Sequence, residues 1–142
     1  MTEAPLEVAF LGVTPQFTVP DLVQTTLYYR DVLGFKILGY WDGERVNPEG
    51  DTSAVFAIVR RDAVEIFFSR AEGPEVRTGC AEGACDAYFR VTGVDALAIE
   101  WKGRGVEIMD GPENRSYGQR ELVIVDCNGL VFAFGEVLAV GA

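Results

Sequence analysis

The sequence predicts an α+β fold that contains two copies of one βαβββ unit, within a single domain of residues 1–142. Three observations support this prediction. Phe17 and Val19 recur 72 residues later as Phe89 and Val91, and further matched segments recur at offsets of 71 and 68 residues. Each copy has one segment with the 3.6-residue period of an amphipathic helix. Each copy also has short apolar runs between turn residues, which are typical of strands.

The first unit is expected over residues 14–70 and opens with a strand at 14–19, where the side chains alternate in character. A helix is predicted at 22–33, because Asp21 can cap its first turn, one of its faces is apolar, and Gly34 can end it. Turn residues then separate three further predicted strands, at 36–42, 53–60 and 63–69.

The second unit is expected over residues 85–137, after a connection at 71–84 that has no apolar period. Its first strand is predicted at 86–91, and its helix follows from Val94 to Trp101, where apolar residues recur at helical spacing. The remaining predicted elements are a strand at 106–109, a loop at 111–118 and a hairpin with strands at 121–125 and 130–134.

The composition limits the functions that the chain can have. The net charge of −10 disfavours nucleic acid as a partner, because phosphates would be repelled. No apolar stretch is long enough to cross a membrane and the N-terminus has no secretory signal pattern, so we expect a cytoplasmic protein. The three cysteines cannot form a closed disulfide set. Histidine, the commonest general base and transition-metal ligand, is absent from the sequence.

Three segments are similar to a known family: FTVPDLVQTTLYYRDVLGF, VDALAIEWKGRGVEI and YGQRELVIVDCNGLVFAFGE. Through them the chain, from about Thr14 to Glu136, resembles the vicinal oxygen chelate superfamily, which includes glyoxalase I, extradiol dioxygenases and bleomycin-resistance proteins. One departure is Cys127, where the family turn usually carries proline. The resemblance implies that the two units form a curved mixed sheet around a cavity, usually within a homodimer.

The resemblance also implies four positions that hold a divalent metal in family enzymes, through His, Gln or Glu side chains. In this chain they correspond to Thr14, Glu65, Asp86 and Ala133. Ala133 has no donor atom, and Thr14 offers only a neutral hydroxyl. Glu65 and Asp86 alone would form a weak oxygen site for Mg²⁺ or Ca²⁺, which is kept as an alternative. We therefore expect no tightly bound metal and no other cofactor.

The side chains expected to line the cavity share a strand face with one of these four positions, or lie at nearby aromatic and loop positions. Each could instead be an ordinary polar or core residue of a half-exposed sheet, and Arg120 could form a structural salt bridge. The predicted cavity residues are Thr14, Gln16, Thr18, Tyr40, Trp41, Glu65, Phe67, Asp86, Tyr88, Arg90, Tyr117, Arg120 and Ala133.

The expected function is metal-free binding of a small molecule by a homodimer of the glyoxalase/bleomycin-resistance type. Aromatic and acidic side chains suggest that it sequesters a cationic or aromatic compound, such as an antibiotic. The alternative is a glyoxalase-like lyase, isomerase or dioxygenase that uses Glu65 as a base or metal ligand. A domain that acts only through protein partners is a third possibility, and a large exposed apolar patch would be its mark.

Overall fold

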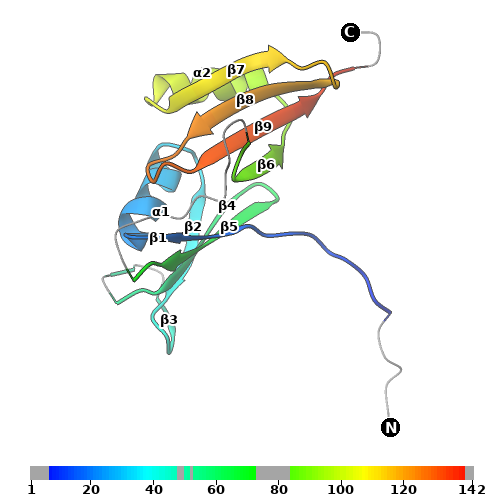
Figure 1. Cartoon of the computed structure of the whole chain (residues 1–142). Coiled ribbons are helices and arrows are strands. Elements are labelled where there is room, and N and C mark those ends of the chain that lie inside the picture. Colours follow the sequence, from blue (N-terminus) through cyan, green and yellow to red (C-terminus); the bar gives the residue numbers. More distant parts are fainter. Residues whose placement is uncertain (1–6, 48–49, 52, 73–83, 140–142) are drawn as a thin grey trace.

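Figure 1 shows the computed structural model of the chain, which describes residues 7–47, 50–51, 53–72 and 84–139. The first unit consists of β1 (Gln16–Val19), α1 (Leu22–Asp31), β2 (Lys36–Trp41), β3 (Val46–Asn47), β4 (Phe56–Arg61) and β5 (Val64–Arg70). The second unit consists of β6 (Ala87–Arg90), α2 (Val94–Gly103), β7 (Glu107–Asn114), β8 (Gln119–Val125) and β9 (Val131–Val137).

The strands form two mixed sheets, one for each unit. The first sheet has the order β1-β5-β4-β2-β3, and the second has the order β6-β9-β8-β7. In both sheets the first strand of the unit pairs in parallel with the last strand, while the other pairs are antiparallel. This shared topology confirms the predicted α+β fold of two βαβββ units.

Some predicted bounds differ from those of the structure. The strand predicted at 106–109 is the longer β7, which reaches Asn114 and takes in the first part of the loop predicted at 111–118. It continues past Gly111-Pro112 because a register shift between Asp110 and Glu113, which spans this pair, lets Glu113 and Asn114 pair with β8 again. The short strand β3 has no counterpart in the prediction. Most of the connection predicted at 71–84 lies outside the described residues.

The start of α1 follows the predicted capping pattern. The Asp21 carboxylate accepts a hydrogen bond from the backbone N–H of Gln24 at 2.9 Å. Gly34 follows the helix with a φ of 82°, the left-handed conformation that favours glycine. The sequence features that predicted this helix therefore act as expected.

Replacement of Asp21 by alanine is expected to lower the free energy of unfolding by about 1 kcal/mol, because the Gln24 N–H loses its acceptor. Urea denaturation measures this change. Asp31→Ala is the matched control: it removes an exposed carboxylate from the end of the same helix and is expected to cost less than ~0.5 kcal/mol. Equal losses in the two variants would contradict the capping role.

The two units share one apolar core, which lies on the helix-bearing side of both sheets. Tyr29 of α1 packs edge-on against Phe68, with ring centroids 5.0 Å apart. In the second unit, Trp101 of α2 packs edge-on against Phe134 at 4.8 Å. Phe17 of the first sheet contacts Phe132 of the second at 5.3 Å. The units are therefore joined through their helix-bearing sides.

Hydrogen bonds at the junction follow the internal repeat, because each unit's β-hairpin contacts the helix of the other unit. The Tyr29 hydroxyl donates to the Asp126 carboxylate at 2.7 Å, in the β8–β9 turn. Arg61, at the end of β4, donates to both oxygens of Glu100 on α2, at 2.8 and 3.0 Å. Two pairs at equivalent places therefore link the units.

The position of the core determines where ligands could bind on the sheets. We call the side of each sheet opposite its helix the outer face. Because both helix-bearing sides meet in the shared core, both outer faces are turned away from it (Figure 1). Within the described ranges, no helix meets the length and hydropathy that a membrane span requires.

Candidate functional site

The outer face of the first sheet brings together four of the predicted cavity residues on two paired strands. Gln16 of β1 pairs with Phe67 of β5, and the Gln16 amide donates to Ser69 at 2.7 Å. Thr18 and Glu65 lie on the same face by strand alternation. Thr14 precedes β1 and is exposed. These residues form a mostly polar strip.

An apolar hollow lies beside this strip on the same sheet. Its volume is about 480 Å³, and its aromatic lining includes Trp41 and Phe56. Trp41 keeps 43% of its surface exposed, and the Phe56 ring contacts Phe67 at 5.2 Å. Within the described part of the chain, the residues that line the hollow all belong to the first unit. An aromatic surface of this kind can stack on a planar ligand.

Tyr40, which was also predicted to line the cavity, borders this hollow beside Trp41, but most of its side chain packs into the core. Its side chain is buried, and its hydroxyl hydrogen-bonds to the Thr26 hydroxyl of α1. The cause is a bulge between Ile37 and Gly39, which shifts the alternation of β2 by one residue. Tyr40 therefore contributes to the inner wall of the hollow rather than to its exposed surface.

The outer face of the second sheet carries four more predicted residues, Tyr88, Arg90, Tyr117 and Ala133. Tyr88 and Arg90 lie on β6, and Tyr88 pairs with Ala133 of β9. Tyr117, from the β7–β8 turn, reaches the same face because its hydroxyl donates to Glu121. Tyr88 is 43% exposed and Tyr117 is 66% exposed, so both rings are accessible.

Arg120 does not lie on this outer face. Its guanidinium donates to Asp95 of α2 at 2.9 Å and to the Asn114 side chain at 3.0 Å. These contacts place it on the helix-bearing side, in the structural salt bridge that the sequence left as an alternative. Glu121, the next residue on β8, faces the opposite side of the sheet, because successive side chains of a strand alternate between its two faces.

Glu121 is the main site residue that the sequence prediction missed. Its buried carboxylate accepts hydrogen bonds from the Tyr88 hydroxyl at 2.7 Å, the Tyr117 hydroxyl at 2.5 Å and Arg115 Nε at 3.1 Å. Arg115 also pairs with Asp110 at 2.6 Å and with Glu113 at 3.1 Å. Alternation along β8 sets Glu121 opposite Arg120, and this signal could have identified Glu121 had Arg120 been assigned to the strand rather than to the loop before it.

Electrostatics keep this cluster in a single protonation state near neutral pH. Burial alone would raise the pKa of Glu121, but hydrogen bonds from Tyr117, Tyr88 and Arg115 outweigh it and lower that pKa. Burial and the bond to Glu121 raise the pKa of Tyr88 to about 12. The bond to Glu121 also raises the pKa of Tyr117. The carboxylate is thus charged and both phenols are protonated.

The four family metal positions do not form a donor set that fits a metal ion. Ala133 has no donor atom, and the Asp86 carboxylate accepts the backbone N–H of Val131 at 2.8 Å. Glu65 lies on the outer face of the first sheet, whereas Asp86 directly precedes β6 of the second sheet. Among the residues that the structure describes, no three His, Cys, Asp or Glu side chains group closely enough to hold a metal.

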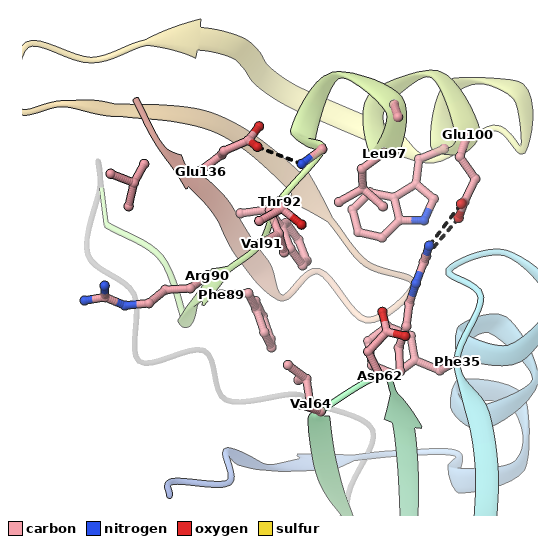
Figure 2. A pocket seen from close by; sticks show the side chains of 17 residues that line it. Phe35, Asp62, Val64, Phe89, Arg90, Val91, Thr92, Leu97, Glu100 and Glu136 are labelled. Carbon is pink, nitrogen blue, oxygen red and sulfur yellow. Dashed lines mark hydrogen bonds and ion pairs between the residues drawn. The ribbon is translucent and has the colours of Figure 1, made fainter. Parts of the chain in front are cut away.

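A larger groove lies at the junction of the two units, on the helix-bearing side (Figure 2). It has a volume of about 750 Å³ between α2, the segment after β6, the end of β9 and the β4–β5 turn. Three of its charged groups are already engaged: Glu100 pairs with Arg61, and Glu136 accepts the backbone N–H of Gly93 at 2.8 Å. Of the predicted cavity residues only Arg90 lines it. The outer faces, whose aromatic and polar side chains are accessible, are the better candidate site.

Several solved structures have the same fold. The bleomycin-binding protein from bleomycin-producing Streptomyces verticillus, solved with copper(II)-bleomycin, is 26% identical with a TM-score of 0.63, covering 94% of this chain and 99% of that chain. TioX from Micromonospora sp. ML1 is 15% identical with a TM-score of 0.68, covering 91% and 100%. TnmS3, an antibiotic-binding protein from Streptomyces sp. CB03234, is 19% identical with a TM-score of 0.62, covering 92% and 99%.

A comparison with curated proteins finds no significant match. The family model described as the Glyoxalase/Bleomycin resistance protein/Dioxygenase superfamily matches residues 12–134. This match extends from the segment before β1 into β9, so it includes both units. The chain therefore belongs to the Glyoxalase/Bleomycin resistance protein/Dioxygenase superfamily.

Proposed function

We propose that this protein sequesters a cationic or aromatic small molecule, such as an antibiotic, without using a metal. It acts as a cytoplasmic homodimer whose chains are single domains, with units at 14–70 and 85–137 joined by the connection at 71–84. The observation that carries the proposal is the accessible set of Trp41, Tyr88 and Tyr117 beside acidic side chains on the outer faces. Aromatic rings bind planar groups, and an acidic protein attracts cations.

The outer faces also support the homodimer. Each is turned away from the shared core, so neither encloses a ligand within one chain. A deep site forms when the first sheet of one subunit covers the second sheet of its partner. The aromatic hollow around Trp41 would then face Tyr88 and Tyr117 of the other copy.

The segment before β1 supports the same arrangement. It runs away from the body of the chain (Figure 1), and Val8, Phe10, Leu11 and Val13 are 90–97% exposed. Four large apolar side chains in such a short segment are costly to leave in water. Contact with a second subunit would bury them.

Copper(II)-bleomycin is the first ligand to test, because the Streptomyces verticillus structure contains it. Calorimetric titration of the wild-type protein is expected to show a saturable heat of binding. Trp41→Ala is expected to weaken binding at least ~10-fold, because the ligand loses a stacking partner. Val46→Ala, which removes an exposed aliphatic side chain from the same hollow, is the control and should change affinity less than ~3-fold. An absence of heat and of any thermal shift would reject this ligand.

Elemental analysis of the purified protein separates sequestration from the alternative enzyme. Near-stoichiometric iron, manganese, nickel or zinc would favour a glyoxalase-like activity that uses Glu65, and would contradict the metal-free proposal.

A further inference from the structure

Glu121, Tyr88, Tyr117 and Arg115 form a hydrogen-bonded group, which we call the Glu121 cluster. The direction of its hydrogen bonds limits which ligand groups it can bind. The Glu121 side chain is only 7% exposed, and both of its oxygens are engaged by tyrosine hydroxyls. An ionised carboxylate accepts hydrogen bonds and cannot donate them. Tyr88 and Tyr117 must therefore each direct their single hydroxyl proton toward Glu121. Their remaining lone pairs can only accept.

The surroundings keep these protons in place. The Tyr88 hydroxyl lies 2.7 Å from the charged Glu121 oxygen but 3.4 Å from Gln119 Oε1, so Glu121 is the stronger acceptor of its proton. Arg115 Nε donates to the Glu121 oxygen that Tyr117 also uses, which favours the ionised carboxylate. The raised pKa values of Tyr88 and Tyr117 keep both phenols protonated at neutral pH.

The charge around the cluster favours the same class of ligand. The carboxylates of Asp110, Glu113 and Glu121 surround Arg115, and Arg90 lies on the same outer face. These three carboxylates and two guanidinium groups give this part of the outer face a net charge of about −1. A ligand cation is attracted here, and a ligand anion is repelled.

We propose that Tyr88 and Tyr117, with their protons committed to Glu121, accept hydrogen bonds from an N–H group of the ligand, so that the site selects amidinium, ammonium or amide groups over carboxylates and phosphates. Glu121 is then a positioning residue that sets specificity through the two tyrosines. This inference rests on the proposed function, because it names the chemical group that the proposed binding site takes.

Gly135 provides a way to disturb the cluster without changing a polar group. A Cβ built at Gly135 would lie 1.8 Å from the Tyr88 hydroxyl, so the Tyr88 side chain crosses β9 where glycine leaves room. Alanine at this position must displace Tyr88 from Glu121. Gly135→Ala therefore tests the same contact if Glu121→Gln does not fold.

The experiment compares benzamidine, benzamide and benzoate, which share one ring and differ in the group attached to it. NMR titration of the full-length protein, followed at the tyrosine rings, gives the dissociation constants. Wild-type protein is expected to bind benzamidinium at least ~10-fold more tightly than benzoate, with benzamide between them. In Glu121→Gln and Gly135→Ala this preference is expected to fall below ~3-fold, because a glutamine amide or a displaced ring lets a tyrosine hydroxyl turn and donate.

A second readout does not depend on any ligand. Absorbance titration is expected to show that Glu121→Gln lowers the pKa of Tyr88 from about 12 toward the ordinary value of 10.0. The double variant with Tyr88→Phe and Tyr117→Phe keeps both rings but removes the acceptors, so it should lose the preference for benzamidinium.

Equal or tighter binding of benzoate, an unchanged preference in the variants, or no binding of any of the three probes would overturn the inference. The outcome with copper(II)-bleomycin is independent of these results. If bleomycin binds at the outer faces while the probes show no preference, the inference fails and the proposed function stands. If benzamidinium is selected but bleomycin does not bind, the proposed antibiotic ligand fails and the donor selectivity stands.

Discussion

Trp101→Ala is expected to lower the free energy of unfolding by about 3–5 kcal/mol, the range for removing a fully buried large aromatic side chain. Trp101 is 1% exposed and packs against Phe134. Its indole N–H also donates to the backbone carbonyl of Leu33 at 3.3 Å, which ties α2 to the first unit. The variant removes packing and a link between the units together. Chemical denaturation followed by circular dichroism measures the loss.

Trp41→Ala is the matched control, because it removes the same type of side chain from an outer face. Trp41 is partly exposed, so its removal is expected to cost about 1 kcal/mol or less. The sequence contains two tryptophans, and this variant leaves Trp101 as the only one to report unfolding by fluorescence. A stability loss in Trp41→Ala as large as that in Trp101→Ala would contradict the assignment of Trp41 to a binding face.

Asp126→Ala is expected to lower the free energy of unfolding by about 2–4 kcal/mol, because several donors lose a buried acceptor. The Asp126 carboxylate accepts the hydroxyl of Tyr29, which is fully buried, and the backbone N–H groups of Asn128 and Leu130, both at 2.8 Å. Asp126→Asn keeps an oxygen for the backbone donors and is expected to cost within about 1 kcal/mol. Equal losses in the two variants would show that the hydrogen bonds at this turn do not hold the units together.

The dependence on pH supplies a second check on Asp126. Burial raises the pKa of Asp126 above 3.8, even though hydrogen bonds from Tyr29 and the backbone lower it. The folded state therefore holds this proton more tightly than the unfolded state does. As the pH rises from 3.8 through the raised value, the wild-type protein is expected to lose stability relative to Asp126→Asn, which does not titrate. If the wild-type protein instead gained stability relative to Asp126→Asn over this pH range, the raised pKa of Asp126 would be contradicted.

The local parts of the fold could be predicted from the sequence, because short-range chemistry determines them. Asp21 caps α1, and both helices lie where their apolar periods indicate. The bulge before Tyr40 could not be predicted, because it arises from pairing between β2 and β4. The contact between Tyr29 and Asp126 joins residues 97 apart in the chain, and no local pattern indicates it.

The candidate site shows the same division. Strand alternation correctly placed Gln16 and Tyr88 on outer faces, since a period of two needs only the strand itself. The prediction assigned Arg120 to a loop before the strand, so alternation was not applied to it, and Glu121 was not considered as a site residue. The way in which the two units pack, and thus which faces remain open, depends on tertiary contacts such as that between Phe17 and Phe132.

We propose that each binding site combines the first sheet of one subunit with the second sheet of its partner. Two variants that each damage one half of such a site distinguish it from a site within one chain: Trp41→Ala on the first sheet and Tyr88→Ala on the second. Neither variant alone should bind copper(II)-bleomycin with wild-type affinity. When the two are unfolded together and refolded, a mixed dimer carries one site made from two undamaged halves.

Calorimetry of the refolded mixture is the decisive measurement. Random pairing makes half of the dimers mixed, so about a quarter of all sites are expected to regain wild-type affinity. Each variant refolded alone should regain none. If the mixture binds no better than the separate variants while both remain folded, each site lies within one chain and the shared-site account is contradicted.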